Sequence, residues 1–138
     1  MKLTINTKDL LSAIQNVVGV VEKKQTMPIL GHILFELTDK KLTLTATDLE
    51  VQMKSYAKAN EAESDKVSFT VSGRKVYDII RSLNEDSVNL LLADDKLTIT
   101  AKKSSYKLAT LSTQDFPVFD DKKPHESFTI NQSDLTRI

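Results

Sequence analysis

The feature that most constrains the fold is an order of hydrophobic patterns that occurs twice along the chain. Each copy begins with a short stretch of alternating apolar and polar residues, continues with apolar residues at helical spacing, and ends with three more alternating stretches. A period of two is typical of half-buried strands, and a period near 3.6 is typical of an amphipathic helix. The sequence therefore predicts two consecutive βαβββ units. This is an α+β fold in which a helix packs on one side of each antiparallel sheet.

The first unit is expected over residues 1–66. After a strand at 2–5, Asn6 is placed to cap a helix that has Asp9 as its third residue. Apolar residues from Leu10 to Val21 form the buried stripe of this helix, and Met27-Pro28 ends any helical run. Strands are predicted at 33–38, 42–46 and 51–59, with a polar loop at 60–66.

The second unit repeats this order. A strand at 67–71 leads into a helix that begins at Ser72 or Gly73 and continues to about Leu83. Three more strands are predicted at 88–93, 97–102 and 106–111, with turns at 94–95 and 103–104.

A second signal of repetition appears near the C-terminus. Residues 128–135 resemble residues 3–10 at an offset of 125, and Thr, Ile, Asn, Asp and Leu are identical in the two copies. The shared residues include the strand alternation, the helix cap and the first core leucine. We therefore expect a first domain at 1–118, a charged linker at 119–126 and the truncated start of a second, similar domain at 127–138. On this hypothesis the natural chain continues for at least one more domain.

Composition excludes several classes of protein. The chain of 138 residues contains no cysteine, which rules out a disulfide scaffold, an iron–sulfur cluster and a thiol nucleophile. No apolar run approaches the ~18–20 residues of a membrane span. The N-terminus also lacks the pattern of a signal peptide. We expect a cytoplasmic protein without a membrane partner. The net charge of zero argues against a strongly basic nucleic-acid binder, but it allows a local basic patch.

The sequence offers no catalytic constellation. The two histidines, His32 and His125, are far apart, and three glycines cannot form a glycine-rich phosphate loop. Asp48 and Glu50 could in principle hold Mg²⁺, although capping of a turn is the favoured interpretation. We therefore expect neither an enzyme nor a bound metal or cofactor. A small metal-dependent hydrolase that uses Asp48 and Glu50 stays open as an alternative.

Basic residues gather on the second expected helix and in the segment after the first. Arg74, Lys75 and Arg81 accompany a single acid, Asp78, on the second helix. Beside the first helix, the basic residues are Lys23 and Lys24. If the two helices share a face, that face is mildly positive and could meet phosphates without gripping them. An ordinary solvated surface explains the same pattern.

Four motifs occur in an order and spacing that resemble the bacterial sliding clamp family, the beta subunits of DNA polymerase III. They are Met27-Pro28-Ile29-Leu30-Gly31, Thr47-Asp48-Leu49-Glu50, Gly73-Arg74-Lys75 and Asp115-Phe116-Pro117. The resemblance covers the whole chain, including the restart after the linker. It implies the DNA-clamp (processivity) fold, with three such domains per chain and a head-to-tail homodimer that closes a ring. Helices line the hole of this ring, and sheets form its outside.

The resemblance also implies roles for particular residues. Sequence-independent contacts with duplex DNA fall to basic side chains on and beside the helices: Lys23, Lys24, Arg74, Lys75 and Arg81, with Gln15 and Asn16 as weaker candidates. The strand at 106–111 resembles the edge that pairs with the second clamp subunit. Its interface residues are Tyr106 and Leu108, with charge pairs from Lys102 and Lys103. An alternative is that Tyr106 and Leu108 simply face the core of the domain.

The family implies a non-catalytic protein that tethers a polymerase. Its partners are duplex DNA, a second clamp subunit, the catalytic subunit of DNA polymerase III and the clamp loader. The pocket for polymerase and loader peptides lies between the second and third domains, so this chain does not carry it. The competing hypothesis is a free-standing β-rich protein-interaction module without a role on DNA.

Overall fold

The computed structural model describes residues 1–21, 27–117 and 128–136. The first unit contains β1 (Lys2–Asn6), α1 (Thr7–Val18), the 3₁₀ turn η1 (Pro28–Gly31), β2 (His32–Thr38), β3 (Lys41–Thr47) and β4 (Gln52–Ala62). The second unit contains β5 (Lys66–Ser72), α2 (Gly73–Ser82), β6 (Ser87–Ala93), β7 (Lys96–Ala101) and β8 (Ser104–Ala109). A 3₁₀ turn η2 (Thr113–Asp115) and a short helix α3 (Gln132–Thr136) follow. The predicted order of elements is confirmed.

Both helices begin where the sequence places a cap. The Asn6 side chain accepts hydrogen bonds from the backbone N–H groups of Lys8 and Asp9, at 2.9 and 3.3 Å. The Ser72 hydroxyl accepts one from the N–H of Lys75. Each bond satisfies donors that the first helical turn leaves without a partner. Both caps therefore fix the point at which a strand turns into a helix.

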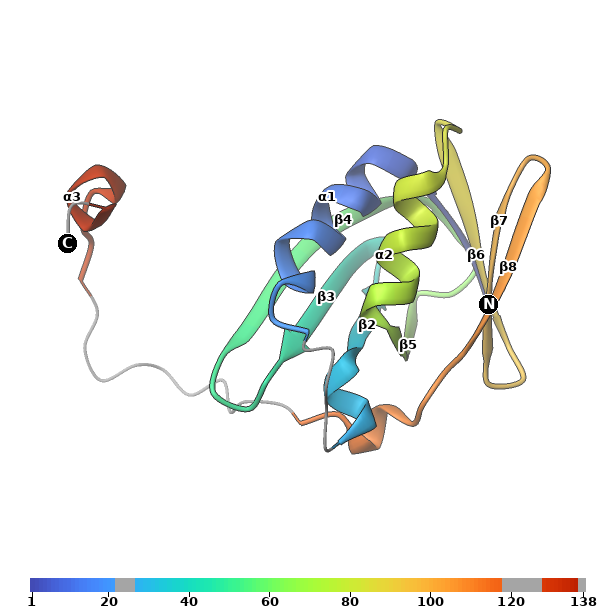
Figure 1. Ribbon diagram of the computed structural model, residues 1–138. Coiled ribbons are helices and arrows are strands. Elements are labelled where there is room, and N and C mark those ends of the chain that lie inside the picture. The colour runs from blue at the N-terminus through green and yellow to red at the C-terminus, as the bar shows by residue number, and fades with distance from the viewer. Residues whose placement is uncertain (22–26, 118–127, 137–138) are drawn as a thin grey trace.

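The strands form one eight-stranded sheet in the order β5-β2-β3-β4-β1-β6-β7-β8. The expectation of a separate sheet for each unit is wrong, because the first strand of each unit pairs with a strand of the other unit. β5 pairs with β2 along seven residues, and β1 pairs with both β4 and β6. The helices α1 and α2 lie side by side and antiparallel across one face of this sheet (Figure 1).

Several predicted boundaries are corrected. The last strand of the first unit runs to Ala62, so most of the expected loop at 60–66 is strand. It extends because β1 pairs with it, with Leu3 opposite Ala62. Helix α1 ends at Val18, although the buried stripe continues to Val21. The last strand begins two residues earlier than expected, because the chain turns at 102–103.

The core lies between the helices and the sheet. Its largest fully buried side chains include Leu3, Ile5, Leu10, Ile14 and Phe35. A smaller apolar cluster on the opposite face of the sheet is formed by Ile29, Leu30, Leu34 and Phe116. Two of the sequence motifs, at 27–31 and 115–117, are thus explained by packing. None of the helices in the described ranges is long and apolar enough to span a membrane.

Gly73 is required by close packing at the start of α2. A Cβ atom at this position would lie 3.0 Å from Val21 Cγ2 and 3.1 Å from Ile33 Cγ1. Those distances are shorter than ordinary van der Waals contact. The glycine therefore lets the first turn of α2 approach the chain that leaves α1.

Candidate nucleic-acid interface

The exposed surfaces of α1 and α2 differ in chemistry. On α1 the solvent-exposed side chains are mostly small or uncharged, and they include Ser12, Gln15 and Asn16. On α2 most exposed side chains are charged, namely Arg74, Lys75, Asp78 and Arg81, and Ser82 is exposed at the end of the helix. Because the two helices lie side by side, these residues share one layer of the molecule (Figure 1). We call this layer the helix face.

The start of α2 concentrates positive charge. Arg74 and Lys75 are both exposed in the first helical turn, which contains no acidic residue. The N-terminus of a helix already carries a partial positive charge, so two cations there oppose the preferred arrangement of charges. The same combination attracts phosphate groups. It gives the helix face a local positive end in a chain of zero net charge.

Arg81 is positioned differently. Its guanidinium lies 3.2 Å from the Asp78 carboxylate, and both side chains are more than half exposed. It also lies 5.1 Å from the centre of the Tyr77 ring. A pair this exposed is weak and exchanges readily with water or other anions. Arg81 therefore remains available to an incoming phosphate, with Asp78 as its competitor.

The other sequence-predicted DNA contacts, Lys23 and Lys24, lie outside the described residues. Gln15 and Asn16 are exposed on α1, as expected. The structure brings their helix against α2, so the described members of the predicted set lie on the same face.

The edge strand β8 carries the predicted interface residues. β8 pairs with β7 along six residues. On its other side, the one bridge among the described residues joins Thr70 of β5 to Leu111, which follows the strand. Tyr106 and Leu108 are half-buried and pack against the core. One side of each side chain therefore faces the core, as the alternative interpretation expects. Lys102 and Lys103 are exposed at the turn before the strand. The remaining edge of β8 is a template for strand addition.

A cavity of about 200 Å³ joins the helix face to this edge. Its walls include His32, Ser72 and Lys75 on one side and Lys107 and Leu108 of β8 on the other. Burial lowers the pKa of His32 below its usual value, hydrogen bonding with Thr70 opposes this, and the charge of Lys75 adds to it. Lys75 thus borders both predicted surfaces.

Sequence reasoning missed the contact that holds the end of β8 to β5. The buried Thr70 hydroxyl donates to the Leu111 carbonyl at 3.1 Å and accepts from the Leu111 N–H at 3.3 Å. His32 Nδ1 lies 3.1 Å from the same hydroxyl. Because the hydroxyl has one proton, Nδ1 carries the hydrogen in this arrangement. No local pattern signals this contact, since it joins residues 41 positions apart.

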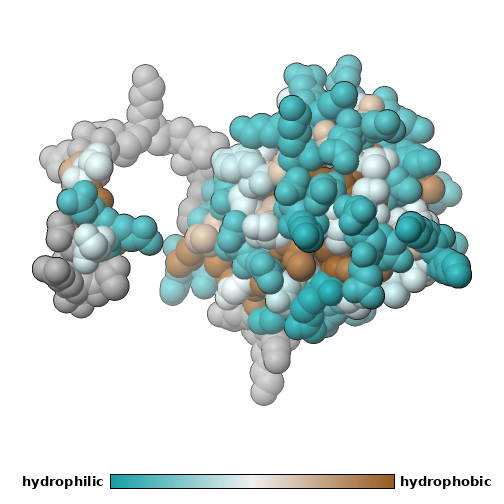
Figure 2. Space-filling model, turned by 90° about the horizontal axis from the view of Figure 1, so that it is seen from above, coloured by the Kyte–Doolittle hydropathy of each residue, from teal (hydrophilic) through white to brown (hydrophobic). Residues whose placement is uncertain are grey.

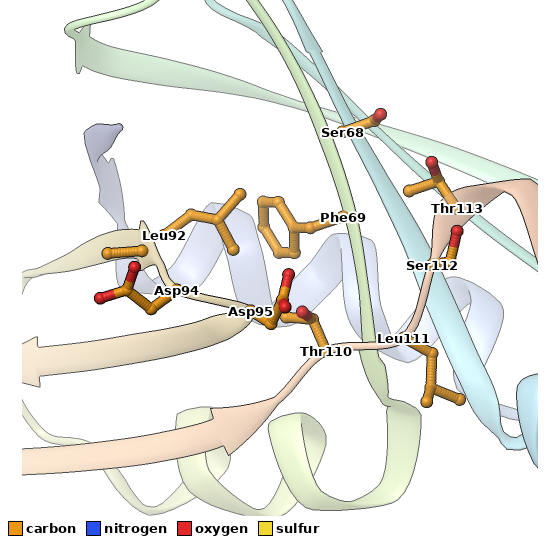
Figure 3. A pocket seen from close by; sticks show the side chains of 10 residues that line it. Ser68, Phe69, Leu92, Asp94, Asp95, Thr110, Leu111, Ser112 and Thr113 are labelled. Carbon is orange, nitrogen blue, oxygen red and sulfur yellow. The ribbon is translucent and has the colours of Figure 1, made fainter.

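A cavity of about 620 Å³ opens where β5 and the chain after β8 separate (Figure 3). Phe69 and Leu92 form its apolar wall, and Asp94 and Asp95 lie at its rim. The lining also includes hydroxyl groups, among them those of Ser68 and Ser112. This combination provides neither a nucleophile with a neighbouring base nor a metal-binding cluster within the described ranges.

The Asp48 carboxylate caps a turn. Its Oδ1 accepts hydrogen bonds from the N–H groups of Val51 and Glu50, at 2.7 and 3.0 Å. These bonds lower the pKa of Asp48. They also hold Leu49 at a φ of 80°, a conformation that few side chains adopt. The conformation of this loop thus supports capping of a turn over the binding of Mg²⁺.

Hydrophilic side chains cover most of the molecule seen from above, and apolar ones appear between them (Figure 2). On the helix face, exposed cations beside uncharged side chains are suited to weak contacts with a polyanion. Base-specific recognition needs side chains aimed at base edges in a groove, whereas contacts with phosphate carry no sequence information. The exposed cations of the helix face are suited to contacts with phosphate.

Comparison with known proteins agrees with this arrangement. The family model for the N-terminal domain of the DNA polymerase III beta subunit matches residues 1–120. The beta sliding clamp of Vibrio harveyi is 38% identical over 136 residues, covering 98% of this chain and 93% of that sequence. The clamp of Pseudomonas aeruginosa is 36% identical over 139 residues, and the chain spans only 38% of its length.

Solved structures of beta sliding clamps are also similar to this chain. A Pseudomonas aeruginosa sliding clamp bound to griselimycin superposes with a TM-score of 0.91 at 36% identity, covering 99% of this chain and 37% of that one. A Helicobacter pylori beta clamp bound to a DNA ligase peptide gives 0.84 at 32% identity, covering 90% and 34%.

Proposed function

Because this chain belongs to the family of DNA polymerase III beta subunits, we propose that it forms the first domain of a sliding clamp that encircles duplex DNA. The family match over residues 1–120 carries the proposal, and it favours a clamp over a free-standing interaction module. The clamp itself performs no chemistry. It tethers the replicative polymerase, and the topological link to DNA supplies processivity.

In this proposal the helix face lines the hole of the ring. Phosphate steering falls to Lys23, Lys24, Arg74, Lys75 and Arg81. Support comes from the exposed cations at the start of α2 and from the weak pairing of Arg81 with Asp78. Uncharged side chains on α1 keep the attraction modest, so the protein can move along the duplex. Tight, base-specific contacts would oppose sliding.

Ring closure uses the β8 edge. Tyr106 and Leu108 would extend their exposed surfaces to a second subunit in a head-to-tail homodimer, while Lys103 would contribute charge at the rim. Support comes from the position of β8 at the end of the sheet order. Strand addition at such an edge satisfies backbone groups that otherwise bond to water.

The domain limits of 1–118, 119–126 and 127–138 follow from the repeat. Phe128, Ile130 and Leu135 are 87%, 44% and 57% exposed. Their counterparts at the offset of 125 are Leu3, Ile5 and Leu10, which are 1%, 0% and 0% exposed. Apolar side chains at core positions need a partner surface. A second clamp domain would bury them as the first buries their counterparts.

The catalytic subunit of DNA polymerase III and the clamp loader are proposed to bind through domains beyond this chain, and the complex acts in the cytoplasm. An immunoblot of a cell extract tests this organisation. The expected band lies near 41 kDa, the 15.5 kDa of this chain divided by the 0.38 of the Pseudomonas relative that it spans. A band at 15.5 kDa would contradict the proposal.

A further inference from the structure

The outer face of the sheet, turned away from the helices, carries a second cationic surface. On β4 the Ser55 hydroxyl donates to the Ala13 carbonyl at 2.6 Å, so odd-numbered residues of this segment point toward α1. Successive side chains of a strand alternate between faces. Tyr56 and Lys58 therefore point to the opposite face, behind β3 and β4 as seen in Figure 1.

This outer face combines an aromatic ring with lysines. Tyr56 is 57% exposed, and Lys58 on the same strand is exposed beside it. Lys41 of β3 lies directly opposite Lys58, and its Nζ lies 4.5 Å from the centre of the Tyr56 ring. A shallow cavity of about 420 Å³ lies over these residues, and its lining also includes Asp39 and Lys40. We call Lys41, Tyr56 and Lys58 the outer cationic face.

The pairing of Lys41 with Lys58 is electrostatically unfavourable. Like charges directly opposite each other destabilise a pair of strands. Within the described ranges, no carboxylate lies at ion-pair distance from either lysine. The Tyr56 ring attracts the Lys41 ammonium, and this compensates only part of the repulsion. An anionic ligand placed between the lysines would relieve the rest.

The spacing of these groups fits one class of ligand. Residues two apart on a strand are separated by about 6.7 Å, so a cation follows the aromatic ring at that interval. Nonspecific binding of single strands combines a positive surface for the backbone with an aromatic side chain on which bases stack. Duplex DNA cannot use such a ring, because its bases are already stacked.

We propose that the outer cationic face binds single-stranded nucleic acid. One base stacks on the exposed part of the Tyr56 ring, and the flanking phosphates pair with Lys41 and Lys58. This contact is independent of the helix face, where duplex binding is proposed. Because few nucleotides are engaged, binding is weak and falls steeply as salt rises.

Fluorescence anisotropy with a labelled oligo-dT of about ten nucleotides tests the proposal at low salt. Tyr56→Ala is expected to weaken binding about tenfold, since loss of one stacked base has an effect of this size. Tyr56→Phe keeps the ring and should bind like the original chain. Lys58→Gln should weaken binding less and reduce the salt slope by about 0.7.

A matched variant separates this site from other cations. Lys96→Gln removes an exposed lysine from β7 and leaves Tyr56 and its neighbouring lysines in place. It should bind oligo-dT unchanged. Binding that is unaffected by Tyr56→Ala, or that is lost equally in Lys96→Gln, would overturn the proposal. So would displacement of oligo-dT by polyglutamate with no effect of Tyr56→Ala, because that result indicates a surface for acidic peptides.

Discussion

The first strands of the two units, β1 and β5, occupy equivalent places in the repeat but are paired differently. β1 is hydrogen-bonded along both edges, to β4 on one side and β6 on the other. β5 is paired along seven residues with β2, while its other edge meets the chain after β8 at one bridge, Thr70 with Leu111. The first strand is therefore paired along both edges in the first unit, which we call closed. In the second unit it leaves most of one edge unpaired, and we call this unit open.

This difference explains where cavities and edges occur. The 620 Å³ cavity lies at the position where β5 lacks a full partner strand. The same opening leaves one side of β8 without a neighbouring strand over most of its length. A repeated sequence pattern thus produces one unit that completes the sheet and one that offers an edge. The proposed subunit interface is on the open unit.

The largest expected effect separates the closed strand from the open one. Ile5 is fully buried on β1, whereas Val67 on β5 is half-buried. Ile5→Ala should lower the free energy of unfolding by about 3 kcal/mol, and Val67→Ala by about 1 kcal/mol. Urea denaturation followed by circular dichroism measures both. Equal losses would show that the two strands contribute alike.

A second pair of variants compares two glycines. Gly73→Ala forces a methyl group against Val21 and Ile33 and should destabilise the chain by about 1–2 kcal/mol. Gly19 has an ordinary helical φ of −63° and open space around it. Gly19→Ala should therefore stabilise by about 0.5 kcal/mol through the unfolded state. Thermal melting of both variants gives the signs, and two losses of similar size would refute this explanation.

The contact between the Thr70 hydroxyl of β5 and the backbone of Leu111, which we call the seam, can be weakened without disturbing the core. Thr70→Val keeps the shape of the side chain but leaves the groups of Leu111 and His32 without the hydroxyl. The expected loss is about 1–2 kcal/mol. Thr98→Val on β7, where the side chain is half-exposed, serves as control and should change stability by less than about 0.5 kcal/mol. Hydrogen exchange at the Leu111 N–H should accelerate in Thr70→Val only.

The smallest effect concerns pH at the same seam. Burial lowers the pKa of His32 from 6.5, so the unfolded chain binds the proton more tightly. Stability from this group is therefore complete above pH 6.5 and declines as the pH falls toward the lower folded value. His32→Gln should flatten the loss of stability between pH 7 and 5. His125→Gln is the matched control, and an equal flattening there would exclude His32 as the cause.

The sequence predicted the elements better than their partners. Both caps, Asn6 and Ser72, and the alternating strands are local patterns, and local patterns determine which residues form a helix or a strand. The pairing of β1 with β6 and of β5 with β2 joins residues far apart in the sequence, and no local pattern contains this information. The same reason explains why the end of β4 was expected to be a loop. Its strand character comes from β1.

The candidate site was predicted in a similar way. The exposed cations of α2 could be identified from helical spacing and charge, and the structure places them beside α1. Residue roles on DNA and at the subunit edge came from resemblance to a family. They remain predictions. The contact of His32 with Thr70 and the opposition of Lys41 to Lys58 depend on strand register, so they could be found only in three dimensions.

The most direct test of the clamp proposal is retention on DNA of different topology. The native full-length protein, loaded on nicked circular DNA, is passed through a sizing column before and after a restriction enzyme linearises the circle. A ring held by topology stays with the circle and is lost from the linear molecule, and we expect this result. Equal retention on both forms would show that direct affinity holds the protein on DNA, and it would contradict the account.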